Sequence, residues 1–149
     1  MVPLSIQIVI DCAHPHPLAD WWAETLGWSV EPQDESFIRS MIDKGFATEA
    51  ETISHNGSLV WASATAVRPA GEAASGQPRI LFQQVPEPKT AKNRIHVDLR
   101  HDRDSDFDLV AFRESLLERG ATEVGGGQQG PHQWVTMADP EGNEFCVDI

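Results

Sequence analysis

LSIQIVID, at residues 4–11, is a compact run rich in β-branched side chains, and RIHVDLR, at residues 94–100, has the same character. Runs of this length and composition are typical of β-strands. They lie in different halves of the chain, and each is followed by a similar succession of segments. The sequence therefore predicts two structural modules of the same kind.

An amphipathic helix is predicted after each of these strands. The first begins near Pro15 and Pro17 and stops at Gly27. Its apolar stripe consists of Leu18, Trp21, Trp22 and Leu26. The second is expected to be capped by Ser105 and to end at Gly120. Its apolar stripe consists of Leu109, Phe112 and Leu116.

Further short strands complete each half. They are expected at residues 28–31, 58–64 and 79–85 in the first half, and at 122–124, 132–137 and 143–149 in the second. The order βαβββ therefore occurs twice, which predicts an α+β fold. We expect one domain over residues 1–149, with module one at about 1–88 and module two at about 89–149.

The first module is longer than the second by about 30 residues, which we place as an insertion at about residues 33–57. Residues 34–44 supply a helix for it, and Asn56-Gly57 is a turn signal before the next strand. Such a helix can form a lid over a binding cleft. Alternatively, it covers a sheet edge, as proteins commonly do with exposed strands.

Composition and charge limit the classes of function. The formal net charge of −12 would repel phosphate backbones and anionic lipid, so neither nucleic acid nor membrane is an expected partner. Cys12 and Cys146 sit inside apolar runs without the spacing of a disulfide framework, and we expect reduced thiols in a cytoplasmic protein. Residues 2–10 are too short and too interrupted for a membrane span or a signal peptide.

Three sequence motifs carry a resemblance to a known family. ADWWAETLGW (residues 19–28), KNRIHVDL (92–99) and MADPEGNEFCVD (137–148), which contains the DPEGNEF turn, occur in the repeated βαβββ order. Together they resemble the vicinal-oxygen-chelate superfamily, which includes the glyoxalase and bleomycin-resistance proteins. The resemblance implies two modules whose strands form a curled mixed sheet around a cleft, and a homodimer. It also implies four inward positions that often bind a divalent metal.

The resemblance places those four positions on the first and last strand of each module. Module one offers Gln7 and Gln83, the latter preferred over Gln84 because Phe82 would point outward. Module two offers His96, the best match to the family's histidine. Its last strand offers Cys146, where the family's metalloenzymes usually carry a glutamate.

This set of donors argues against a resident metal. Two neutral amides, one imidazole and one thiol form a poorly matched set for a divalent ion. No cofactor is therefore expected, although Asp98 or Glu144 can add a carboxylate on the same strand faces. A divalent metal remains the alternative. His14 and His16, in the AHPHP segment, are interpreted as a surface turn and not as ligands.

If alternation holds through the strands, the residues left for chemistry are His96, Asp98, Glu144 and Arg100. A histidine with a carboxylate on its own face can act as general acid or base, and His96 and Glu144 are the candidate catalytic residues. Alternatively, His96 is a hydrogen-bonded core residue. Trp61 is a candidate wall for an aromatic guest, although tryptophans are often core residues.

Two classes of function follow. The first is a metal-independent protein that holds a small organic molecule, such as an aromatic compound, without turning it over. The second is a lyase, isomerase or ring-opening enzyme that uses a weak divalent metal site or the His96 and Glu144 pair. A third interpretation is a domain whose cleft has no remaining chemical role. The candidate ligand-binding residues are Gln7, Gln83, His96, Asp98, Cys146 and Trp61.

Overall fold

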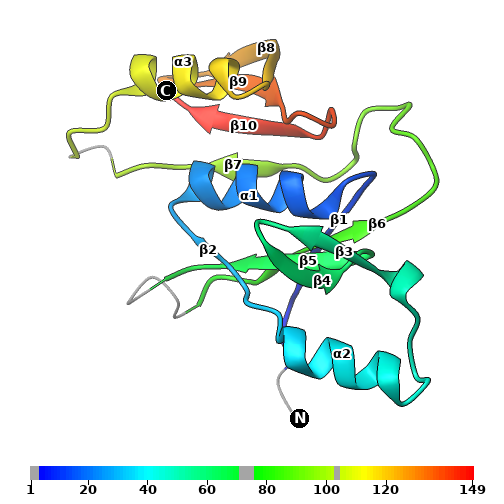
Figure 1. Cartoon of the computed structure of the whole chain (residues 1–149). Coiled ribbons are helices and arrows are strands. Elements are labelled where there is room, and N and C mark those ends of the chain that lie inside the picture. The colour runs from blue at the N-terminus through cyan, green and yellow to red at the C-terminus, as the bar shows by residue number, and fades with distance from the viewer. Residues whose placement is uncertain (1–3, 71–75, 103–104) are drawn as a thin grey trace. The chain divides into compact units, whose positions relative to one another are not determined.

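The computed structural model describes residues 4–70, 76–102 and 105–149. The chain divides into two compact units, Met1–Pro88 and Lys89–Ile149. Each unit contains a mixed sheet and helices (Figure 1). The α+β fold class predicted from the sequence is confirmed.

The first unit is built on a sheet with the strand order β1-β6-β5-β2. The element bounds are β1 Ile8–Cys12, α1 Pro15–Leu26, β2 Ser29–Val30, β5 Ala64–Arg68 and β6 Ile80–Gln84. Strands β1 and β6 are parallel, whereas the other neighbouring pairs are antiparallel. A parallel pair needs a long crossover between its strands, and α1 lies in the chain segment that provides it.

The second unit repeats this topology with the strand order β7-β10-β9-β8. The element bounds are β7 Val97–Leu99, α3 Leu109–Glu118, β8 Thr122–Gln129, β9 His132–Ala138 and β10 Glu144–Asp148. Again the first and last strands are parallel and the other pairs are antiparallel. The predicted βαβββ repeat is therefore present in the chain.

One face of each sheet carries the core. In the first unit Phe82 is 0% exposed, and its neighbours Gln83 and Gln84 are exposed. Helix α1 contributes Leu18, Ala19 and Trp22, all at most 2% exposed. Alternation along the strand assigns Gln83 to the face opposite Phe82, but the exposure of both glutamines leaves the choice of Gln83 over Gln84 a prediction.

The ends of α1 follow from its sequence. Prolines occupy its first turn, where the missing amide hydrogen costs nothing. Gly27 ends the helix with φ = 65°, and its backbone N–H donates to the last carbonyls. A left-handed backbone conformation at this position favours glycine, because glycine has no Cβ that would clash with the backbone.

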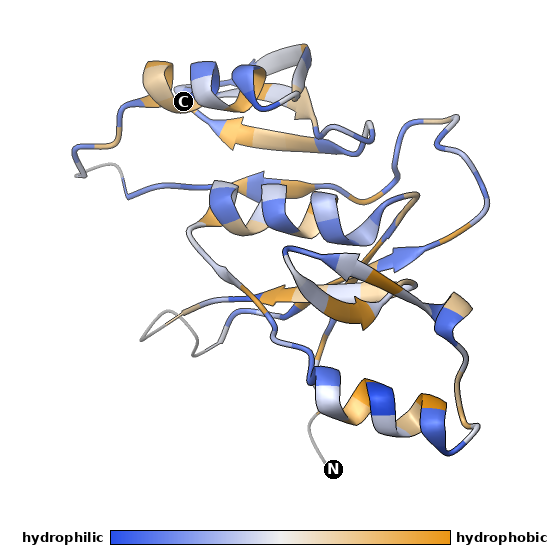
Figure 2. Ribbon diagram, in the orientation of Figure 1, coloured by the Kyte–Doolittle hydropathy of each residue, from blue (hydrophilic) through white to orange (hydrophobic). Residues whose placement is uncertain are grey.

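The first unit also contains a segment that has no counterpart among the described residues of the second unit. It consists of α2 Glu35–Asp43, the short 3-10 helix η1 Glu49–Glu51 and the hairpin β3 Thr52–His55 with β4 Ser58–Trp61. Asp34 caps α2 by accepting a hydrogen bond from the Phe37 N–H at 3.1 Å. Figure 2 shows that hydrophilic and hydrophobic residues alternate around this helix.

Two predicted details of the secondary structure are wrong. Residues 58–64 are not one strand of the main sheet, because β4 pairs with β3 and a separate strand, β5, begins at Ala64. Ser105 does not cap the helix of the second unit. The cap is Asp108, which accepts a hydrogen bond from the Ala111 N–H at 3.0 Å, whereas the Ser105 hydroxyl donates to the Asp102 carbonyl.

None of the helices in the described ranges has the length and apolar character needed to cross a bilayer.

Candidate functional site

The second sheet has one polar face and one core face. The side chains of Val135, Met137, Phe145 and Val147 are at most 6% exposed. Alternation along β9 and β10 therefore places their neighbours on the opposite face. That face carries His132, Trp134, Thr136, Glu144, Cys146 and Asp148. We call it the polar face of the second sheet.

Strand pairing brings three of the predicted site residues together on this face. In the parallel pair of β7 and β10, Cys146 lies beside Asp98. His96 lies two residues before Asp98, on the same side of the chain. The side-chain donor atoms of His96, Asp98 and Cys146 all lie within 4.8 Å of one another.

The three side chains differ in their exposure. His96 and Asp98 are 41% and 42% exposed, and His96 Nε2 lies 3.3 Å from Asp98 Oδ1. Cys146 is only 8% exposed, and its Sγ lies 3.6 Å from the Thr136 hydroxyl oxygen. A solvent-accessible imidazole–carboxylate pair therefore lies beside a buried thiol. Sequence reasoning did not single out Thr136, although the strand alternation that places Cys146 also places it.

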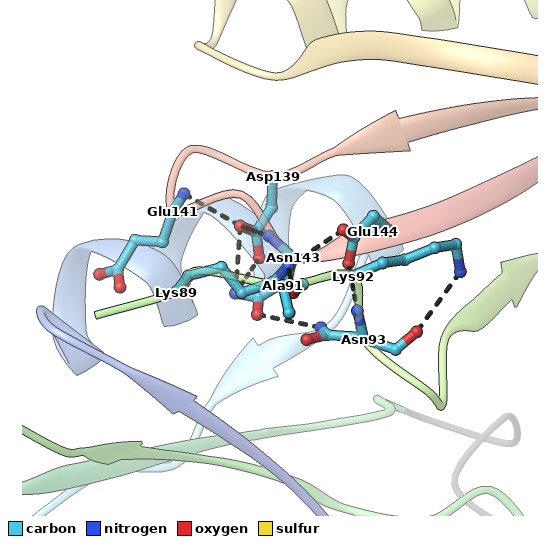
Figure 3. Close-up of polar contacts among 8 residues, drawn as sticks. All are labelled: Lys89, Ala91, Lys92, Asn93, Asp139, Glu141, Asn143 and Glu144. Carbon is cyan, nitrogen blue, oxygen red and sulfur yellow. Dashed lines mark hydrogen bonds and ion pairs between the residues drawn. The ribbon is translucent and has the colours of Figure 1, made fainter. Parts of the chain in front are cut away.

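Glu144 has a different set of partners. Its carboxylate accepts hydrogen bonds from the Lys89 ammonium at 3.0 Å and from the Asn93 N–H at 3.1 Å (Figure 3). Burial raises the pKa of Glu144, but the Asn93 N–H and Lys89 outweigh it, so the net shift is downward. Glu144 is therefore stabilised in its ionised form, and its contacts with Lys89 and Asn93 fix the segment that begins the second unit.

The DPEGNEF motif has a structural explanation within the same set of contacts. Asp139 accepts hydrogen bonds from the backbone N–H groups of Glu141 and Asn143, both at 2.9 Å, and from the Asn143 amide (Figure 3). Gly142 takes φ = 89°, a conformation that favours glycine. This turn leads directly into β10, which begins at Glu144, and it therefore fixes the positions of Glu144 and Cys146 in the sheet.

The other predicted ligand-binding residues belong to the first unit. Gln7 accepts a hydrogen bond from the Arg79 guanidinium through its amide oxygen, and Gln83 is exposed on β6. Trp61 lies in β4 of the hairpin, where its backbone N–H donates to Gln33 at 2.8 Å. Because His96 and Cys146 belong to the second unit, convergence of the four positions stays a prediction.

The interpretation of His16 as part of a surface turn is wrong. His16 is 3% exposed, and its Nε2 lies 2.8 Å from the carbonyl oxygen of Trp61. Its ring also lies 5.0 Å from that of His55, whose Nε2 is 2.7 Å from Asp20 Oδ2. These contacts fix the hairpin to α1, so His16 has a structural role. His14 is exposed, as predicted.

Comparison with known proteins places the chain in a family. Residues 7–147 match the family described as Glyoxalase-like domain, and the chain belongs to this family. Its fold is that of the glyoxalase/bleomycin resistance/dioxygenase, or vicinal-oxygen-chelate, proteins, as the resemblance implied. No curated protein matches the sequence significantly.

Solved structures share the fold at low sequence identity. A mutant of the fosfomycin resistance protein FosX from Listeria monocytogenes, complexed with Mn(II) and 1S,2S-dihydroxypropylphosphonic acid, is 9% identical, with a TM-score of 0.61 over 99% of this chain and 92% of that one. A glyoxalase/bleomycin resistance protein/dioxygenase family enzyme from Burkholderia phytofirmans PsJN is 11% identical, with a TM-score of 0.56 over 95% and 94%. A glyoxylase/bleomycin resistance protein/dioxygenase domain from Frankia sp. EAN1pec is 10% identical, with a TM-score of 0.57 over 100% and 98%.

The manganese in one of these structures raises the question of whether the present residues fit a metal. The four ligand positions that the resemblance implies, Gln7, Gln83, His96 and Cys146, include no carboxylate. The structure adds the Asp98 carboxylate to His96 and Cys146, which gives one nitrogen, one oxygen and one sulfur donor. Zinc accepts all three donor types, and catalytic zinc sites commonly use three protein ligands and leave one position open. The donor set therefore fits a zinc-like ion better than the sequence indicated.

Proposed function

We propose that this chain binds a small organic molecule over the polar face of the second sheet, centred on His96, Asp98 and Cys146, without a resident metal ion. One observation carries the proposal. An accessible histidine is paired with an aspartate 3.3 Å away on the sheet face opposite the core. The glyoxalase-like family to which the chain belongs supports a role in small-molecule chemistry.

The chemistry of the three residues suits binding. The imidazole of His96 can donate or accept a hydrogen bond, and the Asp98 carboxylate fixes its orientation. Cys146 and Thr136 form a less polar surface beside this pair. Such a mixture of apolar surface and a few polar groups is typical of sites that orient an organic guest.

Binding without a metal is favoured by the residue at the family's fourth ligand position. Cys146 stands where the family's metalloenzymes usually carry a glutamate. Glu144 does not replace that glutamate, because its carboxylate accepts hydrogen bonds from Lys89 and Asn93. The same contacts argue against Glu144 as the acid–base partner of His96, and Asp98 takes that place.

A second candidate function is a lyase or isomerase that depends on a divalent metal. It is favoured by the approach of the His96, Asp98 and Cys146 donor atoms to within 4.8 Å of one another. These three residues would hold the ion. When bound, the metal would act as a Lewis acid toward an oxygen of the substrate. Asp98 would then serve as a ligand instead of orienting His96.

Binding is tested with a thermal-shift screen of aromatic and glycosylated metabolites. His96→Ala should abolish the response to a hit, and Cys146→Ala should weaken it, while both variants keep the circular dichroism spectrum of the wild type. His14→Ala is the matched control, because His14 is exposed in the first unit, and it should bind the hit normally. A hit whose affinity ignores both His96 and Cys146 would show that the site is elsewhere.

A further inference from the structure

We propose that Trp134, Arg100 and Asp148 form a subsite for a planar aromatic acid at one end of the polar face of the second sheet. This inference rests on the proposed function, because it names the class of guest and a second set of residues that would hold it.

The first observation is the position of the Trp134 indole. Trp134 lies directly opposite Gly127 in the antiparallel pair of β9 and β8. A Cβ built on Gly127 would lie 2.3 Å from Cζ2 of the indole, far closer than two carbons can approach. The ring therefore rests on the backbone of β8, in space that any other residue at position 127 would fill. This contact holds one face of a rigid aromatic platform in a defined orientation.

The platform is not fully buried. Trp134 is half-buried, and the His132 ring lies beside it with centroids 5.6 Å apart and planes tilted by 33°. A flat aromatic guest gains both apolar contact and favourable ring–ring geometry on such a surface. The alternative is that Trp134 only covers a glycine in the sheet, and the experiment below separates these roles.

The second observation is a charged group beside the platform. Asp148 lies opposite Trp134 in the pairing of β10 with β9. Its two carboxylate oxygens lie 3.4 Å from Arg100 Nε and 3.6 Å from His132 Nε2. The carboxylate therefore holds the Arg100 guanidinium and the His132 ring next to the indole.

Arg100 is the group that would recognise an acid. Its side chain is 70% exposed, and the contact with Asp148 is made through Nε. A guanidinium carries five N–H donors in a fork that matches a carboxylate or phosphonate. The net charge of −12 opposes anions at long range, so recognition of an anionic planar guest would depend on the exposed Arg100 guanidinium at short range.

The subsite is continuous with the candidate site. Asp148 follows Cys146 by two residues on β10, and Trp134 precedes Thr136 by two residues on β9. Two residues along a strand span about 7 Å. A guest that stacks on Trp134 would therefore place an attached group beside Cys146 and Asp98, within the length of one small molecule.

The test uses 2-naphthoate as the probe and measures its affinity by isothermal titration calorimetry and saturation-transfer NMR. Three ligands serve as controls. Cyclohexanecarboxylate lacks the aromatic ring, 2-naphthylmethanol lacks the charge, and a methyl glucoside lacks both. We expect 2-naphthoate to bind about tenfold more tightly than cyclohexanecarboxylate, as ring stacking would supply.

Two variants address the platform independently. Trp134→Leu keeps an apolar side chain but removes the ring, and Gly127→Ala keeps the ring but forces it to move. Each should lower the affinity for 2-naphthoate about tenfold. Arg100→Gln should lower the affinity for 2-naphthoate and leave the affinity for 2-naphthylmethanol unchanged. Gln133→Ala is the control, because Gln133 is an exposed residue of β9 that alternation places on the opposite face from Trp134. It should leave the affinity for both ligands unchanged. Thermal melting checks that each variant is folded.

The outcomes separate this inference from the proposed function. Equal affinity for 2-naphthoate and cyclohexanecarboxylate, or preference for the methyl glucoside, would overturn the aromatic subsite. The aromatic subsite would also be overturned if Trp134→Leu and Gly127→Ala bind 2-naphthoate as tightly as the wild type while His96→Ala does not bind it. That result would leave the proposed function intact. Binding that depends on Trp134 and Arg100 but ignores His96 and Cys146 would support the subsite and contradict the proposed centre.

Discussion

His96, the residue before β7, and Asp98, within β7, form an imidazole–carboxylate pair with Nε2 and Oδ1 3.3 Å apart. Their spacing of two residues puts both side chains on the same side of the chain, and the pairing of Asp98 with Cys146 in β10 then adds the thiol. Because β7 is at the edge of its sheet, both side chains are accessible to a guest from solvent.

Asp98→Asn should weaken binding of a ligand that depends on His96. The change keeps the size of the side chain but removes the charge that orients and supports the imidazole, and we expect a loss of about threefold to tenfold. Calorimetric titration of a screening hit measures this. Asp106→Asn, at an exposed position outside the site, should leave the affinity unchanged. Equal affinity in the Asp98 variant would mean that His96 acts without its carboxylate.

Protein purified without chelators or a histidine tag should contain well under one equivalent of transition metal. The basis is the thiol of Cys146 at the position where the resemblance implies a glutamate ligand, and the hydrogen bonds from Lys89 and Asn93 that occupy Glu144. Elemental analysis measures this directly. Stoichiometric zinc, manganese, nickel or iron that disappears in His96→Ala and Asp98→Asn would instead establish the metal-dependent alternative.

The sequence was sufficient for the βαβββ repeat and for the faces of the strands, because both follow from local periodicity. Phe82 and Phe145 are both 0% exposed, whereas Gln83 is exposed and Cys146 is 8% exposed, so burial alone does not separate Cys146 from Phe145. Periodicity could not assign residues 58–64, since a short apolar run is equally typical of a hairpin strand and of a strand in the main sheet. Here residues 62 and 63 form a turn that separates β4 from β5.

The partners of the site residues were harder to predict, because they come from segments distant in sequence. Periodicity places Glu144 and Asp98 on the same sides of their strands as Cys146 and His96. It does not reveal that Lys89 and Asn93 reach Glu144 from 55 and 51 residues away. The burial of His16 could not be predicted for the same reason, because its hydrogen-bond partner is the Trp61 carbonyl in the hairpin.

Asp108→Ala should destabilise the second unit by about 1 kcal/mol, because the N-terminus of α3 would lose the hydrogen bond between Asp108 Oδ1 and the Ala111 N–H. Asp108→Ser should retain most of the stability. Thermal or urea denaturation followed by circular dichroism measures both. Ser105→Ala is the matched control, because Ser105 precedes the cap and should change stability little. A larger effect at Ser105 than at Asp108 would contradict this assignment of the cap.

We also expect the chain to be a homodimer in solution. The family resemblance implies this state, and closed twofold dimers are the commonest oligomers. Large apolar side chains at Leu4, Ile6 and Ile95 are 95%, 79% and 86% exposed in the single chain, as surfaces covered in an assembly often are. Light scattering should give about twice the chain mass of 16.4 kDa. A monomer at high micromolar concentration would exclude the dimer.

The pair formed by Glu31 and Arg79 should make the first unit less stable in acid. Arg79 Nε donates to Glu31 Oε1 at 2.8 Å, and the same guanidinium donates to Gln7. The hydrogen bond from Arg79 lowers the pKa of Glu31, and its effect exceeds the opposing effect of burial. The charges of Arg79 and Arg68 lower this pKa further.

The direction of the pH effect follows from that shift. A carboxyl group whose pKa is lower in the folded state stabilises the fold above its ordinary value of 4.5, and this contribution is lost as pH falls through the folded pKa. Glu31→Gln should therefore reduce the free energy of unfolding by about 1 kcal/mol at pH 7. The difference from the wild type should shrink as pH falls from 4.5 through the lowered folded pKa, because the wild-type carboxyl then becomes protonated as well. Urea denaturation at a series of pH values measures both. The control is Glu118→Gln, an exposed position on α3, and a pH-independent difference for Glu31→Gln would contradict the role given to the ion pair.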